Sequence, residues 1–325
     1  MKQLDSDIIS KNCPKVSICV PVYKVEKHIS KCAESLMQQT YENLEFLFVN
    51  DGTPDNSIKV LLDVIEKYPK QKRKVNIVNL QINKGVANAR NIAVEHCIGD
   101  YIFWCDSDDW LEKDTIEILV NELIKTNSDI VTCNTIIHSG KKTYLSNLPE
   151  NPLEYIIKET HIYRIWGRLI KKSLYIDNNI RTQDAIAEDL QTTPKLLYYA
   201  KKHHNVNKGL YHYNLNNQNS IGKSANNIDW YRQLLKSYYI FYNFIIGRNN
   251  EKYTDLINRG KNDFLLYYMK SCVLTSQKNA FQLLRQELIK HEKDYPRYKR
   301  HGFKHLLKKN YTISHFVIKY LQRKH

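Results

Sequence analysis

Short apolar runs, rich in β-branched and aromatic residues, alternate with amphipathic segments in the first two thirds of the chain. Runs of this kind are typical of buried strands. They lie at residues 15–23, 44–49, 75–78, 101–105, 129–134 and 206–213. Apolar positions three and four residues apart predict helices over 26–39 and 58–68, beginning near 83 and near 111, and over 187–200. A strand–helix alternation of about 25 to 30 residues indicates an α/β fold with a mostly parallel sheet.

The pattern changes twice further along the chain. Between residues 140 and 187 it loosens, and the segment 148–152 resembles a linker because it contains two prolines. After residue 226, Tyr, Leu, Ile and Lys recur with helical spacing and without a short chemical motif. We therefore predict an α/β domain over residues 1–224 and a helical, basic region over residues 225–325.

Composition narrows the class of protein. A chain of 325 residues that is 42% hydrophobic can bury a substantial core. The best candidate for a membrane span, residues 240–246, is far shorter than the roughly 18 residues required. The amino terminus is polar and carries acids, which does not fit a secretory signal. Seven scattered cysteines without a CxxC pair indicate a reducing cytosol, with neither a disulfide framework nor a zinc site.

The formal net charge of +15 indicates an anionic partner. Residues 299–325 hold eight Lys and Arg and four His, without an acid. Such a basic end is typical of docking on an anionic membrane surface. Nucleic acid or another polyanion is the alternative partner. Exposed basic helix faces that serve no partner are a further alternative.

Three acids directly follow the apolar run 101–105: Asp106, Asp108 and Asp109. Charge is poorly tolerated inside a buried strand, so this cluster belongs where the strand emerges at its carboxyl end, the usual ligand site of an open α/β sheet. In extended backbone Asp106 and Asp108 point the same way, and paired carboxylates suit Mg²⁺ or Mn²⁺ bound with a phosphorylated substrate. Alternatively, Asp108 or Asp109 caps the helix that begins near residue 111.

Other acids also follow predicted strands or begin predicted helices. Asp51 follows the strand 44–49, and Glu188 and Asp189 open the helix 187–200. The chain contains neither GxGxxG nor a Walker loop, so these familiar phosphate sites are excluded. A metal with a pyrophosphate, a nucleotide and an attacking hydroxyl each need carboxylates or acceptors of this kind.

Five segments in order resemble the motifs of family 2 inverting glycosyltransferases with the GT-A fold. They are SICVPVY at 17–23, VNDGTPDNS at 49–57, NKGVANARN at 83–91, DSDD at 106–109, and Glu188-Asp189. The resemblance covers roughly residues 15–222. It implies a mixed, mostly parallel sheet flanked by helices, with a helical C-terminal extension. It also implies a nucleotide-sugar donor, usually UDP-linked, and Mn²⁺ or Mg²⁺ as cofactor.

By position, the resemblance also implies roles for single residues in the donor and metal sites. The implied donor-binding residues are Pro21, Tyr23, Asp51, Arg90, Asp106 and Ser220. Within this set, Asp51 accepts a hydrogen bond from the base and Ser220 serves the pyrophosphate. Asp108 is implied as the direct metal ligand, and Asp106 as a residue that meets the ribose, or the metal through water.

The remaining implied roles concern catalysis and the acceptor. Asp189 corresponds to the general base, and Glu188 to the neighbour that holds the acceptor or donor sugar. The segment 166–169, with Trp166 and Arg168, corresponds to the family segment near the acceptor.

One position departs from the family pattern. Similar enzymes often place an Arg directly after a Tyr-x-Tyr pair and a Ser six residues later. Here Tyr211 and Tyr213 are followed by Asn214, while Ser220 matches. The expected cation is therefore missing at 214, and three basic residues are candidates to replace it: Lys208, His212 and Lys223.

Together these features favour a cytoplasmic transferase, peripheral on the inner face of the plasma membrane. It would move a hexose or N-acetylhexosamine from a UDP-sugar to a hydroxyl of a growing glycan or lipid-linked acceptor, such as lipopolysaccharide, capsule or teichoic acid. Two alternatives stay open: a protein that binds nucleic acid or another polyanion through its basic end, and an inactive glycan-binding scaffold. Nucleic acid is less favoured, because it leaves the acids at strand ends unexplained.

Overall fold

A computed structural model of the chain describes residues 13–147, 149, 151–159, 163–217, 227–290 and 311. It divides into two compact units. The first comprises the described parts of Met1–Glu150, Arg164–Asp184 and Lys195–Asn219, and the second those of Asn151–Tyr163, Ala185–Pro194 and Ser220–His325. The predicted domain boundary at residue 224 stays a prediction.

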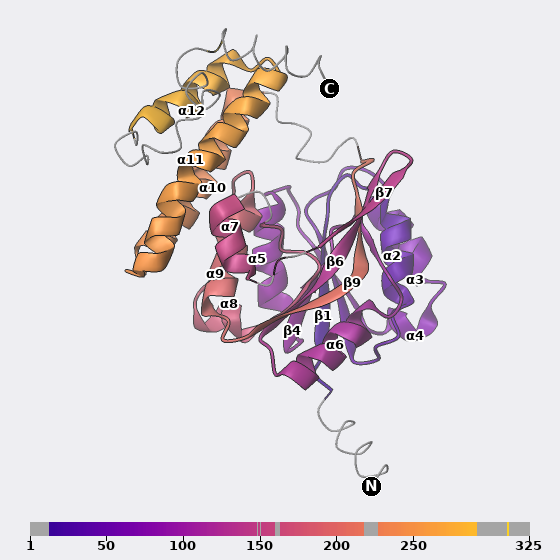
Figure 1. The fold of residues 1–325 in the computed structure, drawn as a ribbon. Coiled ribbons are helices and arrows are strands. Elements are labelled where there is room, and N and C mark those ends of the chain that lie inside the picture. Colours follow the sequence, from indigo (N-terminus) through magenta and orange to yellow (C-terminus); the bar gives the residue numbers. More distant parts are fainter. Residues whose placement is uncertain are drawn as a thin grey trace. The chain divides into compact units, whose positions relative to one another are not determined.

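The first unit is built on one mixed sheet with the strand order β3-β2-β1-β4-β8-β6-β9-β5, and β7 pairs with β6 (Figure 1). Its strands are β1 (Val16–Val22), β2 (Leu44–Asn50), β3 (Val75–Asn79), β4 (Tyr101–Trp104), β5 (Trp110–Leu111), β6 (Ile130–Ser139), β7 (Lys142–Ser146), β8 (Arg168–Lys171) and β9 (His203–Asn214). Its helices are α2 (Ile29–Met37), α3 (Ser57–Ile65), α4 (Pro69–Lys72), α5 (Val86–His96), α6 (Thr115–Thr126) and α8 (Ser173–Asp177).

The four strands from β3 to β4 are parallel. Of these, β1, β2 and β4 are buried almost throughout, and Figure 1 shows α2 and α3 on one side of the strands and α5 on the other. All seven residues of β1 except Pro21 are buried. Since β2 and β4 both pair with β1 in parallel, their carboxyl ends lie at the same edge of the sheet.

The other half of the sheet mixes directions. β8 pairs antiparallel with β4 and with β6, whereas β6 and β9 run parallel. The β6–β9 register shifts on both sides of Asn134, a bulge that leaves Gly209 opposite it. A Cβ at Gly209 would lie 2.8 Å from side-chain atoms of Ile136 and of Leu145, so only glycine fits there without displacing its neighbours.

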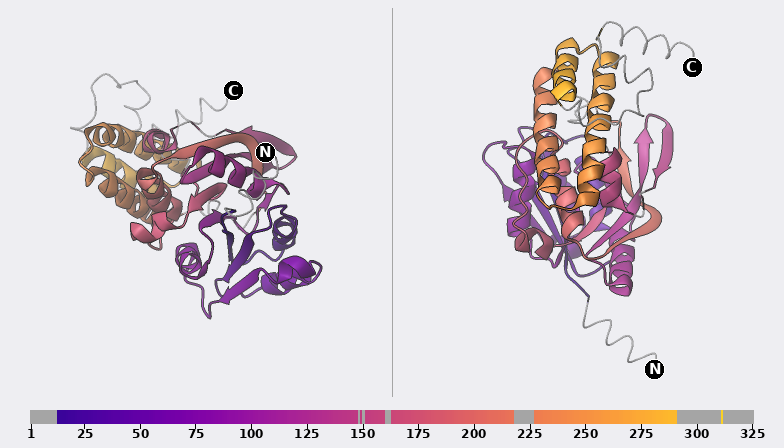
Figure 2. Two further views of the ribbon diagram at one scale, coloured as in Figure 1. Left: turned by 90° about the horizontal axis from the view of Figure 1, so that it is seen from below. Right: turned by 60° about the vertical axis from the view of Figure 1, so that its left-hand side comes forward.

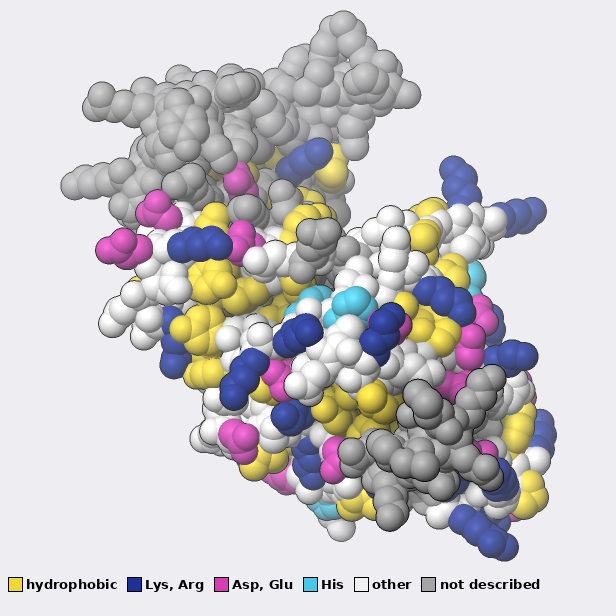
Figure 3. All heavy atoms as spheres, turned by 60° about the horizontal axis from the view of Figure 1, so that its bottom comes forward, with side chains coloured by type: hydrophobic (Ala, Val, Ile, Leu, Met, Phe, Trp, Pro, Cys, Tyr) yellow, Lys and Arg dark blue, Asp and Glu magenta, His cyan; other side chains and the backbone are white. Residues whose placement is uncertain are grey.

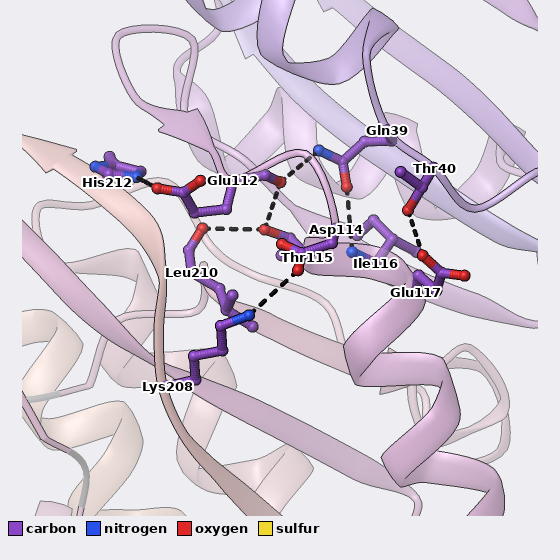
Figure 4. Close-up of polar contacts among 10 residues, drawn as sticks. All are labelled: Gln39, Thr40, Glu112, Asp114, Thr115, Ile116, Glu117, Lys208, Leu210 and His212. Carbon is purple, nitrogen blue, oxygen red and sulfur yellow. Dashed lines mark hydrogen bonds and ion pairs between the residues drawn. The ribbon is translucent and has the colours of Figure 1, made fainter.

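The helix that was predicted to begin near residue 111 begins later in the structure. Its predicted start is therefore wrong. Trp110 and Leu111 form β5, which pairs antiparallel with β9, and α6 begins at Thr115. The Gln39 side chain fixes this start, because its Oε1 accepts from Ile116 N at 3.1 Å and its Nε2 donates to Glu112 O at 2.8 Å (Figure 4). The network of Figure 4 also ties the start of α6 to β9, because Thr115 Oγ1 donates to Leu210 O and Lys208 Nζ donates to Asp114 Oδ2.

The second unit is helical. It contains α7 (Pro152–Glu159), the beginning of α9 (Glu188–Tyr199), α10 (Ile228–Ile246), α11 (Glu251–Leu274) and α12 (Lys278–Lys290). Figure 2 shows α10, α11 and α12 as long helices packed side by side. Aromatic rings fill the contact, as Tyr238 stacks on Phe264 with 4.1 Å between ring centroids. None of the described helices combines the length and apolar character needed to cross a bilayer.

Candidate active site

Three acids lie in a tight turn after β4, residues 106–109, called the acid turn below. Asp109 N donates to Asp106 O at 3.0 Å, which closes the turn. The expected extended backbone between Asp106 and Asp108 is therefore wrong. The acids of the turn have partners on other segments of the chain.

Asp109 is fully buried and is held by β9. Tyr211 Oη donates to Asp109 Oδ2 at 2.6 Å, and Asn214 N donates to Asp109 Oδ1 at 2.8 Å. Asp108 Oδ2 accepts from Asn217 Nδ2 at 2.7 Å. The alternative of a helix cap is thus wrong for both acids, since α6 begins only at Thr115 and they bind groups elsewhere.

The acid turn brings several carboxylates close together where they are partly buried from solvent. Burial raises the pKa of Asp108, and the nearby Asp106 carboxylate raises it further. Burial likewise raises the pKa of Asp109 well above its usual range, with added repulsion from Asp108 and Asp106. A cation beside these carboxylates would relieve this repulsion, because an opposite charge favours the ionised form.

The acid turn fits a divalent cation that is completed by a substrate. Among the described residues, no group of three His, Cys, Asp or Glu side chains is arranged to hold a metal ion alone. Mg²⁺ typically binds through one or two carboxylates together with substrate phosphates and water. Asp106 and Asp108 supply hard oxygen ligands of this type, so the donor set suits Mg²⁺ or Mn²⁺ with a phosphate ligand.

Asp51 follows β2 at the same edge of the sheet. It is 2% exposed, and its Oδ1 accepts from Lys84 N at 2.9 Å. Burial raises the pKa of Asp51, although hydrogen bonds from the Lys84 and Gly85 amides oppose that rise. Asp51 therefore fixes the segment that leads into α5, which carries Arg90.

Arg90 projects from α5 to the acid turn. Its Nη2 lies 3.1 Å from Asp106 Oδ1, and its Cζ lies 5.9 Å from the centroid of the Trp104 ring. Two predicted donor-site residues, Arg90 and Asp106, are thus brought together. Their contacts with a nucleotide stay predictions.

Pro21 and Tyr23 lie at the carboxyl end of β1, beside Asp51. Pro21 pairs with Val49 in the register of β1 with β2, and Asp51 N donates to Val22 O at 3.0 Å. Tyr23 is 37% exposed, and the Lys24 ammonium lies 5.2 Å from its ring centroid. An exposed ring at this edge is open to stacking with a planar ligand.

Trp166 and Arg168 are almost wholly buried. The Trp166 ring stacks on Tyr211 and on Tyr213, with centroids 4.4 Å and 4.9 Å apart. Arg168 is 1% exposed, and its Nη1 donates to Thr132 Oγ1 at 3.2 Å. Their assignment to the acceptor stays a prediction.

Glu188 and Asp189 begin α9 and belong to the second unit. Ser237, fully buried in α10, donates to Ile186 O at 2.6 Å and accepts from Gln191 Nε2 at 2.8 Å, which anchors this helix start. Both acids lie close enough to Tyr163 to help burial and Tyr268 raise the pKa of its hydroxyl. Their catalytic roles stay predictions.

The candidates for the missing cation at Asn214 have acidic partners where they are described. Lys208 Nζ lies 3.2 Å from Asp114 Oδ2, and His212 Nε2 lies 2.9 Å from Glu112 Oε1. Burial lowers the pKa of His212, although Glu112 opposes this. Lys223 and the predicted donor residue Ser220 lie outside the described residues.

The sequence analysis assigned no role at this site to Tyr211 or Asn217. It also did not identify the contacts that Asp109 makes with β9. Strand alternation offers one signal, because Tyr211 and Tyr213 must face one side of β9 and His212 the other. That pattern identifies a tyrosine face on β9. It does not identify the partner of that face, which lies a hundred residues earlier in the chain.

Comparisons with known proteins agree with this geometry. The model of the family described as Glycosyl transferase family 2 matches residues 17–187. The uncharacterized glycosyltransferase EpsJ of Bacillus subtilis (strain 168) is 31% identical over 222 residues, which cover 64% of this chain and 63% of that protein. The chain spans less than two thirds of the length of several curated relatives that it matches.

Solved structures show the same fold at low identity. A crystal structure of S. aureus TarS 1–349 in complex with UDP-GlcNAc has a TM-score of 0.71 at 19% identity, covering 95% of this chain and 92% of that chain. A mannosyltransferase from Pyrobaculum calidifontis, in complex with GDP-Man and Mn²⁺, has a TM-score of 0.54 at 15% identity, covering 97% and 89%. The prediction of a GT-A fold with a helical C-terminal extension is confirmed.

Proposed function

The chain belongs to glycosyl transferase family 2, and from that premise we propose that it transfers a sugar from a UDP-sugar to a hydroxyl group of a growing cell-surface glycan. The observation that carries this proposal is the placement of Asp51 and the acid turn. They follow β2 and β4, two strands that flank β1, so a nucleotide and its diphosphate can be bound at one edge of the sheet.

The donor is proposed to be a UDP-linked hexose or N-acetylhexosamine. Asp51 is proposed to accept from the base, and Arg90 holds Asp106 at the same edge of the sheet. The UDP-GlcNAc in the TarS structure supports this class of donor. The acceptor is proposed to be lipopolysaccharide, capsule, teichoic acid or a similar lipid-linked glycan.

Asp108 is proposed as the direct ligand of Mn²⁺ or Mg²⁺, with Asp106 reaching the ion through water. When bound, such an ion neutralises the charge that develops on the departing diphosphate. The Mn²⁺ in the related mannosyltransferase structure supports the choice of metal. The chain's own contribution is to hold Asp106 through Arg90 and Asp108 through Asn217, so that both carboxylates are fixed before the donor arrives.

Asp189 is proposed as the general base, with Glu188 holding a sugar. An acceptor hydroxyl has a far higher pKa than a carboxylate, so its proton moves to Asp189 only as the bond to the anomeric carbon forms. One displacement from one side of the sugar inverts the configuration at that carbon. Trp166 and Arg168, which are both buried, are proposed to shape the acceptor site.

A thermal-shift experiment tests the donor and the metal together. UDP-glucose and UDP-GlcNAc are expected to raise the Tm of the full chain in the presence of Mn²⁺ and much less after EDTA, since a ligand that binds only the folded state stabilises it. Asp108→Ala should abolish the Mn²⁺-dependent shift. Asp63→Ala, which changes an exposed acid of α3, is the matched control. Sugar transfer that survives EDTA, or that is unaffected by Asp108→Ala, would overturn the proposal.

The protein is proposed to act at the cytoplasmic face of the plasma membrane, on the strength of its net charge of +15. The basic segment 299–325 lies outside the described residues apart from Tyr311. Partition of the full chain onto vesicles that contain anionic lipid, compared with neutral vesicles, tests this placement. Deletion of residues 299–325 should abolish the preference, and an unchanged partition would remove the idea.

Binding of nucleic acid is a less favoured explanation for the net positive charge of the chain. On the face shown in Figure 3, Lys and Arg side chains are interspersed with acidic, apolar and other polar side chains. A nucleic-acid site typically gathers its basic residues along one stripe or patch. An inactive scaffold is likewise less favoured, because the acid turn keeps three carboxylates at the cost of mutual repulsion.

A further inference from the structure

We propose that Tyr211 is a positioning residue for the metal site, acting together with Asp109. Its hydroxyl joins the two ends of the acid turn and so sets the geometry in which Asp106 and Asp108 meet a divalent cation and a nucleoside diphosphate. This inference rests on the proposed function. It concerns two residues that have no implied role as donor, metal or acceptor ligands.

The hydroxyl of Tyr211 makes two hydrogen bonds within the acid turn. It donates to Asp109 Oδ2 at 2.6 Å and accepts from Asp106 N at 3.1 Å. A phenol has one hydrogen to donate, and that hydrogen is directed at Asp109. Asp106 and Asp109 are thus linked through one oxygen atom, in addition to the backbone bond that closes the turn.

The ring of Tyr211 is fixed as firmly as its hydroxyl. Tyr211 is fully buried, and Trp166 stacks on its ring at an interplanar angle of 13°. The Phe103 ring is a second neighbour, with its centroid 6.4 Å from that of Tyr211. A fully buried ring between such neighbours has little freedom, so its hydroxyl is a fixed reference point for the acid turn.

Asp109 is the partner of Tyr211 in this arrangement, and its oxygens are not free to bind a metal. Each of its oxygens accepts one bond, from Tyr211 Oη and from Asn214 N, and the residue is fully buried. The same stretch of β9 and the residues after it bring Asn217 to Asp108. Through Asp109, the end of β9 is therefore fastened to the acid turn, which leaves Asp106 and Asp108 as the carboxylates with partial exposure.

A matched pair of tyrosine variants tests the inference. Tyr211→Phe keeps the stacked ring and removes the hydroxyl. Tyr238→Phe is the control, because it removes the hydroxyl of another buried tyrosine, whose ring stacks on Phe264. The readout is the affinity of the full chain for Mn²⁺ in the presence of UDP, measured by titration calorimetry, with Tm recorded alongside.

We expect Tyr211→Phe to weaken the Mn²⁺ affinity at least about tenfold, because Asp106 N and Asp109 Oδ2 both lose their partner. Tyr238→Phe should leave that affinity within about twofold of the unchanged protein. A loss of stability alone would lower Tm without changing the affinity of the molecules that remain folded. This difference separates positioning of the metal site from a purely structural role.

The outcomes are distinguishable from those of the proposed function. If the unchanged protein binds Mn²⁺ with UDP and Tyr211→Phe binds it equally well, the inference fails and the proposed function stands. If the unchanged protein binds no Mn²⁺, the proposed metal dependence fails and the inference with it.

A second variant covers the case in which Tyr211→Phe does not fold. Asp109→Asn keeps the shape of the side chain but leaves one of its two donors without an acceptor, and the same weakening is expected. Loss of the fold in both variants would assign the pair a structural role only, and that result overturns the proposal.

Discussion

Arg90 and Asp106 form an ion pair across two segments of the site, with 3.1 Å between Nη2 and Oδ1. The side chain of Arg90 is 5% exposed, whereas that of Asp106 is 30% exposed. This partly exposed carboxylate therefore compensates part of the buried positive charge. The pair fastens α5 to the acid turn, so it links stability to the geometry of the donor site.

Arg90→Met should lower the free energy of unfolding by about 2 kcal/mol, because it leaves Asp106 without its cation in a partly dry site. Arg181→Met is the matched control, since it breaks an exposed pair with Glu95 at side-chain exposures of 63% and 41%. Arg181→Met should lower the free energy of unfolding by less than about 0.5 kcal/mol. Urea unfolding of both variants measures the difference, and equal costs would contradict the role given to Arg90.

Gly52→Ala should destabilise the protein more than Gly140→Ala. Both glycines have positive φ, +62° and +59°. A Cβ at Gly52 would lie 2.8 Å from Asn83 N, whereas a Cβ at Gly140 meets nothing within 4 Å. The shared backbone strain costs about 1 kcal/mol, and the clash at Gly52 should add at least about 1 kcal/mol.

The same pair of glycine variants reports on the donor site. The clash at Gly52 pushes on the segment whose Lys84 amide binds Asp51. Gly52→Ala should therefore weaken UDP binding, and Gly140→Ala should leave it unchanged. Calorimetric titration of UDP in the presence of Mn²⁺ measures both. Equal UDP affinities in the two variants would show that this contact with Asp51 is dispensable.

His203 should make stability depend on pH. Burial lowers its pKa to about 3, and its Nε2 lies 2.9 Å from Thr132 Oγ1. The folded protein keeps this imidazole neutral, while the unfolded chain takes up a proton below about pH 6.5. Stability from this residue is thus present at neutral pH and is lost as the pH falls through that range. Between about pH 7 and about pH 5 the loss should be about 1 to 2 kcal/mol.

His203→Gln serves as the comparison for that measurement. It keeps a polar group that can bind Thr132 but cannot titrate, so its unfolding free energy should change less between the two pH values. Urea unfolding at both pH values gives the two differences. A drop in the variant as large as in the unchanged protein would assign the pH dependence to other groups.

Asp189→Asn should lower kcat by about 10²- to 10⁴-fold, which is the usual contribution of a general base. Affinity for UDP-sugar with Mn²⁺ should stay nearly unchanged, because the carboxylate is needed only as the acceptor loses its proton. Glu188→Gln should act mainly on KM. If Glu188→Gln proves the more damaging to kcat, the roles of the two neighbours are reversed.

The sequence allowed the parallel part of the sheet to be predicted closely. The run 15–23 contains β1 (Val16–Val22), and the run 44–49 nearly coincides with β2 (Leu44–Asn50). These strands are buried on both faces, so their identity depends on local composition alone. The helical C-terminal region was also predicted from a local pattern, because its apolar residues recur with helical spacing.

The region between 140 and 187 could not be predicted in this way. β8 (Arg168–Lys171) has four residues and carries two basic ones, yet Arg168 is 1% exposed. Its burial depends on Thr132 and on the Arg164 carbonyl, to which its Nε donates at 3.0 Å. These partners come from tertiary contacts that no local pattern records. The role of Asp109 was missed for the same reason, because it depends on β9.

The bulge at Gly209 sets which side chains of β9 face the acid turn. Beyond it, Tyr211 points to Asp109 while His212 pairs with Glu112 on the opposite face. A strand alternates with every residue, so gaining or losing one residue between Gly209 and Tyr211 would exchange the two faces. Natural length variation in relatives is therefore expected to avoid that short stretch, and insertions made by engineering should go to the turn at Gly140, where space is open.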